Sequence, residues 1–447
     1  MVWRIHLFRI HRPLLPFLLS VVAVLSGCSY GGFYAHQAHW RQTFTYLPSV
    51  SALNKLSPED SLVLSGEIMK RQKRQEPLLL VAVSNQYRQN EKVAVVQLQT
   101  DTSYMAFLPT GDYELFVFAD LDRNRDFERN ERVGLARVTI SPDRAKGGIV
   151  AAGPPITVDF EHPGTVDFRL SETVRPAGYV YASLDDEFFD PKYGVAGVYN
   201  PSELISRTQG FLFGLEDYNE EKTTVLFVHG ISGTPRDWKY LVEGLDRSRF
   251  QPFFFYYPSG LPLDKLGGLL AQIIETMDKT TANGRHKTVL VAHSMGGLVA
   301  ISAINKLSAE GLAASLKMFC SFSTPYAGDE SIRKWIDNAP VVVPSWRDIA
   351  APNEFLRDLT DTPLPKRLPF YLFFSYHDTS KFKLGESSDG SVSLRSQLTP
   401  TLQAAAAKVL GFNETHVGIL NSEAARGSFL RLLDTVSPPR RPAEHGQ

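Results

Sequence analysis

The residues best suited to covalent chemistry lie in the segment V-L-V-A-H-S-M-G-G-L at positions 289–298. An apolar run typical of a buried strand breaks at a Ser between small residues, and apolar residues then resume with helical spacing. A strand that leads directly into a helix makes a tight, strained turn, which lifts the Ser294 hydroxyl clear of the backbone at the helix N-terminus. Gly296 gives the helix room beside the turn, whereas Ala292 stands where the G-x-S-x-G pattern has its first Gly. The spacing predicts a nucleophile elbow with Ser294 at its apex.

A second segment offers an electrostatic partner for this nucleophile. Residues 223–228, T-T-V-L-F-V, predict a buried strand, and the loop H-G-I-S-G-T-P follows at 229–235. In acyl transfer, negative charge develops on the carbonyl oxygen, and a preorganised backbone N–H stabilises it by about 3 kcal/mol. We expect the backbone amides of Ile231 and Met295 to form this oxyanion hole. His229 and His293 stand at strand ends, where a packed structural role is more common than a catalytic one.

Together these segments resemble the α/β-hydrolase superfamily. The order of strand, H-G loop, helix, strand and A-H-S-M-G-G turn, followed by F-S-T-P-Y-A-G at 322–328, is similar to bacterial lipases and esterases and to the GPI-inositol-deacylase-like group. The resemblance covers about residues 205–436 and implies a mostly parallel sheet flanked by helices. It also implies the chain order Ser, acid, His, so the acid and the base should follow Ser294.

Two acids are candidates for the middle position. An aromatic, β-rich segment at 369–376 predicts a strand, and Asp378 and Asp389 come after it. We favour Asp389, because S-D-G-S-V at 388–392 is similar to the D-G-x-V segment that carries the acid in such lipases, with Gly390 letting the carboxylate turn inward. Asp378 lies closer to the strand end and is the alternative acid, or else a residue of a solvated turn.

Two histidines follow Asp389, and they differ in their surroundings. His445 lies in a Pro- and Arg-rich tail, whereas His416 stands in N-E-T-H-V-G-I-L at 413–420, a loop that leads into the last helix and resembles the family's base position. His416 would take the proton of Ser294, and Asp389 would hold the imidazole in the required tautomer. This cycle requires no metal or organic cofactor.

The N-terminus predicts export and lipid anchoring. Three arginines precede an apolar run at 14–24, which is too short to span a bilayer and is typical of a signal peptide over residues 1–27. The L-S-G-C segment at 25–28 resembles the bacterial lipobox, which implies that Cys28 is lipidated and anchors the chain to a membrane. Ser29 is similar to the pattern for delivery to the outer membrane of the bacterial envelope. Cys320, the other Cys, is expected to be a free thiol packed in a strand.

Length and composition suggest several domains. The chain has 447 residues, 43% of them hydrophobic, and a net charge of −1, which gives no electrostatic reason to expect nucleic acid as a partner. Nothing in the sequence indicates an oligomeric state. Short strands expected at 78–83, 92–98, 113–119, 133–140, 156–160 and 165–170 predict a small antiparallel β-sandwich. The predicted segments are a signal peptide at 1–27, a lipidated tether at 28–75 with a helix expected at 58–74, the sandwich at 76–172, a linker containing Pro, Gly and Asp at 173–204, an α/β-hydrolase domain at 205–436 and a disordered tail at 437–447.

One loop of the expected sandwich has the spacing of a calcium site. Oxygen-bearing side chains occupy positions 1, 3, 5, 7, 9 and 12 of the segment 120–131, and hard oxygen donors at such spacing can surround one ion. Arg125 stands where an EF-hand has Gly, and a strand rather than a helix precedes the loop, so a solvated hairpin turn is the alternative. The candidate ligands are Asp120, Asp122, Asn124, Asp126, Glu128 and Glu131.

The sequence constrains the substrate less closely. Residues 329–368 lie where related lipases carry lid or cap elements, and their Trp and Val residues are expected to form the core of a helical cap or to line an acyl pocket. We expect a carboxylic ester, in particular an acyl-lipid or another ester near the membrane. An acyltransferase or thioesterase would use the same triad, and a non-catalytic envelope binding protein would keep the fold as a scaffold.

Overall fold

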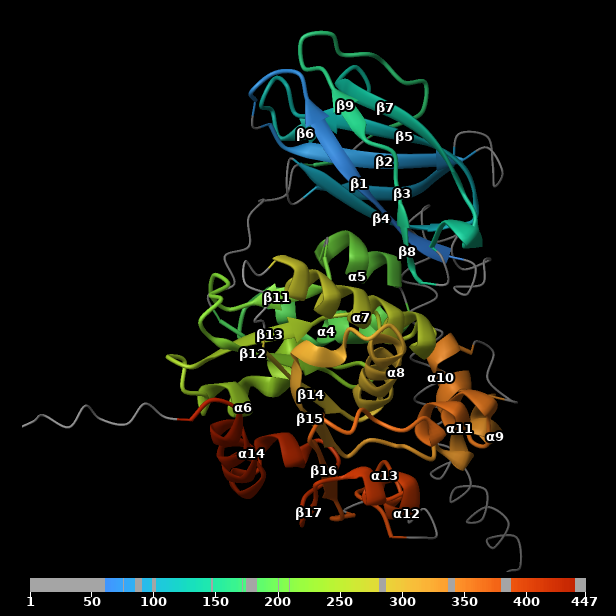
Figure 1. Cartoon of the computed structure of the whole chain (residues 1–447). Helices are drawn as coiled ribbons and strands as arrows, with labels where there is room; N and C mark the ends of the chain where they lie inside the picture. Colours follow the sequence, from blue (N-terminus) through green and yellow to red (C-terminus); the bar gives the residue numbers. More distant parts are fainter. Residues whose placement is uncertain are drawn as a thin grey trace, which may run out of the picture.

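The structure comprises a β-rich N-terminal unit and a C-terminal unit of helices around a sheet, packed against each other (Figure 1). It is a computed structural model that describes residues 61–74, 76–84, 91–98, 102–145, 148–170, 172–173, 183–199, 201–208, 210–280, 287–336, 342–378 and 387–438. The predicted signal peptide, Cys28 and His445 lie outside the described residues.

The C-terminal unit is built on a seven-stranded sheet with the order β11-β13-β12-β14-β15-β16-β17. Neighbouring strands are parallel except for the antiparallel pair β11 and β13. This mostly parallel sheet with flanking helices confirms the predicted α/β-hydrolase fold. The strands are β11 (Leu212–Gly214), β12 (Thr223–Val228), β13 (Phe250–Phe255), β14 (Thr288–His293), β15 (Leu316–Phe322), β16 (Phe370–Ser375) and β17 (Lys408–Phe412).

The central strands β12, β13 and β14 are buried along their whole length and mostly apolar, because helices cover both faces of the sheet. In β12, Leu226 and Val228 pack on one face, while Val225 and Phe227 pack on the other. The helices are α4 (Pro191–Tyr199), α5 (Pro201–Thr208), α6 (Lys239–Glu243), α7 (Leu263–Thr280), α8 (Met295–Ala309), α9 (Glu330–Ile336), α10 (Pro344–Ile349), α11 (Glu354–Asp361), α12 (Leu394–Gln397), α13 (Pro400–Ala405) and α14 (Glu423–Val436). Short 3₁₀ helices are η2 (Pro142–Ala145), η3 (Glu187–Phe189), η4 (Pro235–Trp238), η5 (Ala313–Ser315) and η6 (Gly418–Asn421).

The N-terminal unit is built on one eight-stranded sheet with the path β3-β2-β5-β7-β9-β1-β4, in which β8 also pairs with β1. The sheet is mixed rather than wholly antiparallel, because β1 runs parallel to both β8 and β9. The strands are β1 (Ser61–Lys70), β2 (Leu78–Ser84), β3 (Glu91–Gln97), β4 (Ser103–Pro109), β5 (Gly111–Ala119), β7 (Arg132–Ile140), β8 (Val150–Ala152) and β9 (Ile156–Val158). A separate pair joins β6 (Asp126–Phe127) to β10 (Glu172–Thr173).

Two predicted elements of this unit are wrong. The helix expected near residues 58–74 is a strand over its described part, β1, because pairing with β4 and β9 buries Leu62 and Leu64 within the sheet core. The strand expected at 165–170 forms no ladder, although Phe168 and its apolar neighbours pack on the outer face of the sheet. Alternating apolar residues therefore indicated burial in both segments but did not determine the hydrogen-bonding partner.

The predicted linker is also wrong from residue 183 onward, because this segment belongs to the hydrolase unit. Prolines begin α4 and α5, since Pro is tolerated in the first helical turn. A Cβ at Gly194 would lie 2.2 Å from the Ser232 backbone oxygen, so α4 can approach the loop after β12 only with Gly at this position. Ile205 of α5 shares a core with Phe107 of β4, which packs the two units together.

Candidate active site

Ser294 lies between β14 and α8, at the carboxyl edge of the parallel sheet. Its backbone has φ 53° and ψ −133°, a region that costs a non-glycine residue on the order of 1–3 kcal/mol. The Ser294 N–H donates to the Phe322 carbonyl at 2.8 Å, which fixes the turn against β15. A Cβ at Gly296 would lie 2.4 Å from the His229 backbone oxygen, so the first turn of α8 requires Gly there. The turn is the strained strand-to-helix elbow that the spacing predicts.

His416 lies in the loop after β17, and its imidazole lies between Ser294 and Asp389. Its Nε2 is 2.8 Å from the Ser294 Oγ, and its Nδ1 is 2.8 Å from the Asp389 Oδ2. A carboxylate only accepts, so Nδ1 carries the proton and Nε2 is free to accept the hydroxyl proton of Ser294. The His416 backbone N–H also donates to the Asp389 carbonyl at 3.0 Å, which joins the two loops directly.

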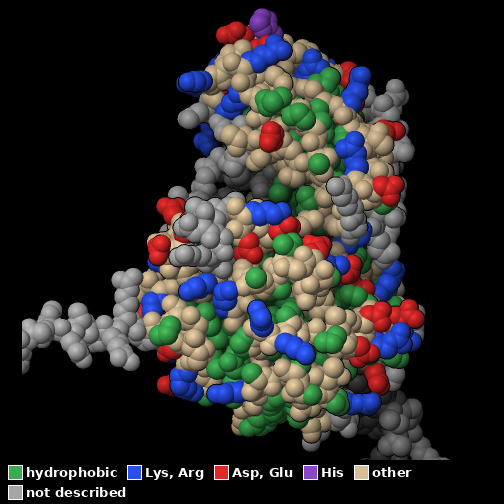
Figure 2. Space-filling view, in the orientation of Figure 1, with side chains coloured by type: hydrophobic (Ala, Val, Ile, Leu, Met, Phe, Trp, Pro, Cys, Tyr) green, Lys and Arg blue, Asp and Glu red, His purple; other side chains and the backbone are tan. Residues whose placement is uncertain are grey.

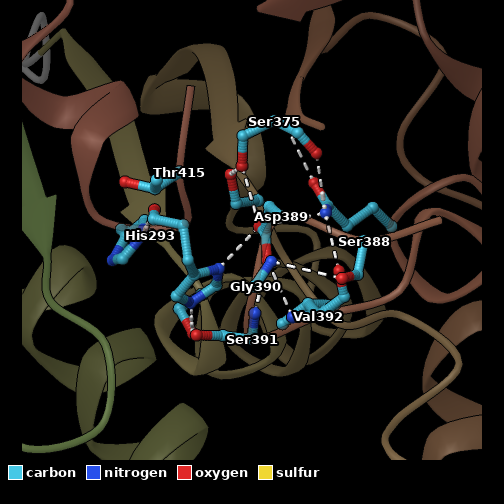
Figure 3. A network of polar contacts seen from close by, with 12 residues as sticks. His293, Ser375, Ser388, Asp389, Gly390, Ser391, Val392 and Thr415 are labelled. Carbon is cyan, nitrogen blue, oxygen red and sulfur yellow. Dashed lines mark hydrogen bonds and ion pairs between the residues drawn. The ribbon is translucent and has the colours of Figure 1, made fainter. Parts of the chain in front are cut away.

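The Asp389 carboxylate is buried at 1% exposure and is surrounded by donors (Figure 3). Its Oδ1 accepts from the backbone N–H groups of Ser391 at 3.0 Å and Val392 at 2.7 Å. Burial alone raises the pKa of this carboxyl, but the hydrogen bond and charge of His416, with the other donors, outweigh it and hold the pKa below its usual value. Asp389 is therefore ionised at neutral pH despite its burial.

Asp378, the alternative acid, has a different partner. Its Oδ2 accepts from the Ser388 hydroxyl at 2.9 Å. A Cβ at Gly390 would lie 3.7 Å from the Asp378 Oδ1, which places this carboxylate beside the 388–390 turn. The structure thus joins Ser294, His416 and Asp389 in one relay and places Asp378 next to the loop that presents Asp389.

Three polar residues behind Asp389 were not predicted. Ser375 Oγ lies 2.7 Å from Asp389 Oδ2 and 2.6 Å from Ser323 Oγ, and Gln397 Nε2 donates to the same carboxylate oxygen at 3.0 Å. Because the carboxylate can only accept, Ser375 gives it its one proton and Ser323 must donate to Ser375. The available sequence signal is a Ser just at the end of β15 and another at the end of β16, where functional side chains gather in a parallel sheet.

The two histidines at strand ends make structural contacts. His293 Nε2 donates to the His416 carbonyl at 2.8 Å, and burial lowers the pKa of His293 to about 3. His229 Nδ1 donates to the Gly230 carbonyl at 2.7 Å, its ring stacks on Tyr257, and burial lowers its pKa to about 4. Both imidazoles are neutral at neutral pH, and His293 ties the elbow to the loop that carries His416.

The two residues predicted for the oxyanion hole follow directly on the elbow and on β12. Met295 is the first residue of α8, and its backbone stands at the positive end of that helix. A Cβ at Gly230 would lie 3.0 Å from the Ser294 Cβ, so the Gly230 and Ile231 backbone passes immediately beside the serine. The side chains of Ile231 and Val417, next to this backbone and to His416, are 36% and 57% exposed.

The segment after β15 contains α9, α10 and α11, as the cap prediction implies. Ile349 and Leu356 from α10 and α11 join the same core as α7 and α8. Trp346 packs edge-on against Tyr199 of α4, with ring centroids 6.1 Å apart. These side chains form the core of a helical layer on the hydrolase unit. Cys320 is a buried free thiol in β15, as expected.

The predicted calcium loop lies between β5 and β7 of the N-terminal unit. One oxygen each from Asp120, Asp122 and Glu131 lies within 4.8 Å of the others. Asp126 and Glu128 lie outside this group of three. The Asn124 side-chain oxygen accepts from the Asp126 backbone N–H at 2.7 Å, and its amide donates to Asp122 and Glu128.

One family model matches part of the chain. Residues 218–338 match the family model described as "Putative serine esterase (DUF676)". The matched segment contains Ser294 and ends before Asp389. No curated protein sequence matches the chain.

Solved structures of lipases are similar to the chain over about half its length. The mature form of Bacillus licheniformis lipase BlEst2 is 18% identical, with 50% of this chain and 98% of that chain covered and a TM-score of 0.39. Aspergillus fumigatus lipase B is 16% identical, with 49% of this chain and 55% of that chain covered and a TM-score of 0.38. The family match and the site geometry together support an ester hydrolase.

Two surface properties bear on the partners. Basic and acidic side chains are interspersed over both units on the face shown in Figure 2, in line with the net charge of −1. Within the described ranges, no helix has the length and apolar character needed to cross a bilayer.

Proposed function

We propose that this chain is a serine hydrolase that cleaves carboxylic esters through Ser294, His416 and Asp389. The observation that carries the proposal is the continuous relay from the Ser294 Oγ through His416 to the buried, ionised Asp389, with two contacts of 2.8 Å. A neutral Ser hydroxyl is a poor nucleophile, and a hydrogen-bonded, correctly oriented imidazole is what activates it.

The reaction would proceed in two acyl transfers. As the Ser294 oxygen bonds to the carbonyl carbon, its proton moves to His416 Nε2, and the carbonyl oxygen becomes an oxyanion. The imidazolium then gives this proton to the leaving alcohol oxygen as the carbon–oxygen bond breaks. Water attacks the acyl-enzyme, gives a proton to His416, and the proton returns to Ser294 as the carboxylic acid leaves. Asp389 stabilises the imidazolium in both steps.

The backbone N–H groups of Ile231 and Met295 would bind the oxyanion. The positions of these two residues support this assignment. The Gly230 and Ile231 backbone passes beside Ser294, and Met295 is the first residue of α8. The helix dipole adds positive potential at the same point. The mechanism is carried by these protein groups, with no cofactor among the reacting groups.

The substrate would be an ester with an apolar acyl or alkyl part. Ile231, whose backbone N–H is assigned to the oxyanion hole, and Val417, which follows the base His416, have exposed apolar side chains. Large exposed apolar residues beside a reacting group favour contact with apolar ligand surface. An acyl-lipid ester would meet this chain at a membrane if Cys28 is lipidated, as the lipobox resemblance implies. We propose on this basis that the enzyme is anchored to the bacterial envelope, at the outer membrane.

The test is hydrolysis of a p-nitrophenyl ester series, from acetate to palmitate, by the full chain in detergent. Ser294→Ala should lower kcat at least about 10⁴-fold, while Ser391→Ala, at an exposed serine beside Asp389, should change it less than about threefold. Acyl transfer to an added alcohol, or preference for thioesters, would identify the acyltransferase or thioesterase alternatives. An unchanged rate in Ser294→Ala would reject the proposal, and a folded wild type without any acyl chemistry would leave a binding protein on a hydrolase scaffold.

A further inference from the structure

Carboxylates converge in the loop between β5 and β7, remote from Ser294. Asp120 follows β5, Glu131 precedes β7, and the exposed Asp122 lies between them in sequence. One oxygen from each residue lies within 4.8 Å of the other two. Three carboxylates held this close repel one another unless a cation or protons offset their charge. The loop contains β6, which is labelled in the upper unit in Figure 1.

Asp120 supplies a second and independent observation. The residue is 4% exposed. Its Oδ2 accepts from the Arg125 backbone N–H at 3.2 Å, but its Oδ1 is buried and has no hydrogen-bond partner. A buried carboxylate oxygen without a donor is costly, because it has lost its hydration without replacement. Asp120 is one of the three residues whose carboxylates converge. A cation bound among them would give the unpartnered Oδ1 a positive charge to contact.

Glu131 is equally buried, at 4% exposure. Each of its oxygens accepts one backbone N–H, from Leu121 at 2.7 Å and from Glu128 at 3.0 Å. These two hydrogen bonds orient the Glu131 carboxylate, but a backbone N–H carries only a partial positive charge.

The Arg123 side chain of this loop forms its ion pair outside the three carboxylates. The Arg123 guanidinium lies 3.2 Å from the Glu76 carboxylate, which also pairs with Arg74 at 2.9 Å. Those three residues form an ion-pair group of their own, at the start of β2. Arg123 therefore neutralises Glu76 and not the carboxylates of Asp120, Asp122 and Glu131. The negative charge of these three residues is available to a bound cation.

We propose that Asp120, Asp122 and Glu131 bind a calcium ion. The donors are hard carboxylate oxygens without His or Cys, which excludes a zinc-type ligand set and suits Ca²⁺ or Mg²⁺. Ca²⁺ accepts irregular geometry and completes its six to eight ligands with water and backbone carbonyls, whereas Mg²⁺ demands a near-ideal octahedron. Three carboxylates from one loop, with water and backbone carbonyls as further ligands, fit Ca²⁺ better.

The ion would stabilise the N-terminal unit. Phe127 of β6 lies in the same loop and packs with Phe168 and its neighbours on the outer face of the sheet. β6 also pairs with β10, which leads toward the hydrolase unit. A cation that closes the loop would therefore hold this outer layer in place. The inference is independent of the ester hydrolase proposal.

The experiment measures Ca²⁺ binding and thermal unfolding of the full chain in detergent, with MgCl₂ and EGTA as comparisons. Wild type should bind one ion per chain with a Kd of about 10⁻⁵–10⁻³ M, and Ca²⁺ should raise the Tm of the N-terminal unit by several degrees. Asp122→Asn should weaken binding at least about tenfold. Asp126→Asn is the matched control, an exposed Asp of the same loop outside the carboxylate group, and should bind like wild type.

Asp120→Asn gives a second readout, because it removes the unpartnered charge. It should abolish the Tm rise in Ca²⁺ without lowering the Tm in EGTA; if it fails to fold, Asp122→Asn decides. Ester hydrolysis should be equal in Ca²⁺ and EGTA, so failure of either proposal is recognised separately. No binding by wild type at about 10 mM Ca²⁺, equal binding of Mg²⁺, or equal losses in Asp122→Asn and Asp126→Asn would overturn the inference.

Discussion

The two units assemble their polar centres in different ways. In the hydrolase unit, Ser294 and His416 are 122 positions apart in the chain, and the parallel sheet brings them together at one edge. In the N-terminal unit, the carboxylates gather within one loop, where Leu121 and its partner Glu131 are only 10 positions apart. A parallel sheet collects distant residues at its carboxyl edge, whereas a hairpin concentrates local ones.

This difference also sets what holds each centre in place. Asp389 is fixed by side chains from β16 and α12 as well as by its own loop. The carboxylates of Asp120 and Glu131 receive their hydrogen bonds from backbone N–H groups of their own loop. We therefore expect the hydrolase site to be sensitive to substitutions far away in sequence, and the loop of the N-terminal unit to be sensitive to a bound ion.

The largest expected effect separates the two acids of the hydrolase unit. Asp389→Asn removes the carboxylate that holds His416 Nδ1–H, and kcat should fall about 10³–10⁴-fold. Asp378→Asn, the matched control, should change kcat less than about threefold, since Asp378 bonds to Ser388. Steady-state kinetics on one p-nitrophenyl ester measures both, and similar losses in the two variants would refute the assignment of Asp389.

A smaller effect compares glycines of the two units. Gly296→Ala places a Cβ 2.4 Å from the His229 backbone oxygen, and the free energy of unfolding should fall by about 3 kcal/mol or more. Gly66→Ala places a Cβ 2.5 Å from the Tyr104 ring, an adjustable side chain, and should cost about 1–2 kcal/mol. Denaturant unfolding resolves the two values. Equal costs would mean that the elbow is no tighter than the sheet of the N-terminal unit.

Acid should destabilise the hydrolase unit first. The pKa values of buried His229 and His293 are lowered to about 4 and about 3. Their unfolded pKa is about 6.5, so below that pH the unfolded chain binds more protons. The free energy of unfolding should then fall by up to about 1.4 kcal/mol per pH unit for each His. Stability is complete above about pH 6.5 and declines toward the folded pKa values.

Thermal unfolding from pH 7 to pH 5 checks this dependence. His293→Gln should flatten the decline, while His162→Gln, at an exposed histidine of the N-terminal unit, should leave it unchanged. A decline of the same slope in both variants would assign the acid sensitivity to other groups.

The smallest predicted effect concerns the residues behind Asp389. Ser375→Ala removes one donor to the carboxylate, so the pKa of Asp389 should rise and kcat should fall about tenfold at neutral pH. Ser388→Ala is the matched control, because the Ser388 hydroxyl donates to Asp378 and accepts from the Gly390 N–H but gives no hydrogen bond to the Asp389 carboxylate. The acid limb of the pH–rate profile should move upward only in Ser375→Ala. A uniform loss at every pH would indicate a purely structural role for Ser375.

The sequence predicted the hydrolase unit better than the N-terminal unit, for physical reasons. The strand predicted at 223–228 has the same first and last residues as β12, and the elbow at Ser294 has the predicted backbone strain. Both could be predicted because a buried strand and a tight turn each require particular residue types in a short segment. β1 was mistaken for a helix because its strand character comes from partners more than thirty residues away in the chain.

The candidate site shows the same division. Ser294, Asp389 and His416 stand in local motifs, so their sequence surroundings mark them. Ser375 and Gln397 were missed because their contact with Asp389 exists only once β16 and α12 have packed. The prolines of α4 and α5 suggested a linker, although in the structure they begin helices that pack on the hydrolase core.

Covalent labelling with a fluorophosphonate, followed by mass mapping of the labelled peptide, is the first measurement to make. We predict a single label on Ser294 in wild type, formed much more slowly in Asp389→Asn and at the wild-type rate in Asp378→Asn. A label on another residue, no label on folded protein, or an undiminished rate in Asp389→Asn would contradict the proposal that Ser294 is activated through His416 and Asp389.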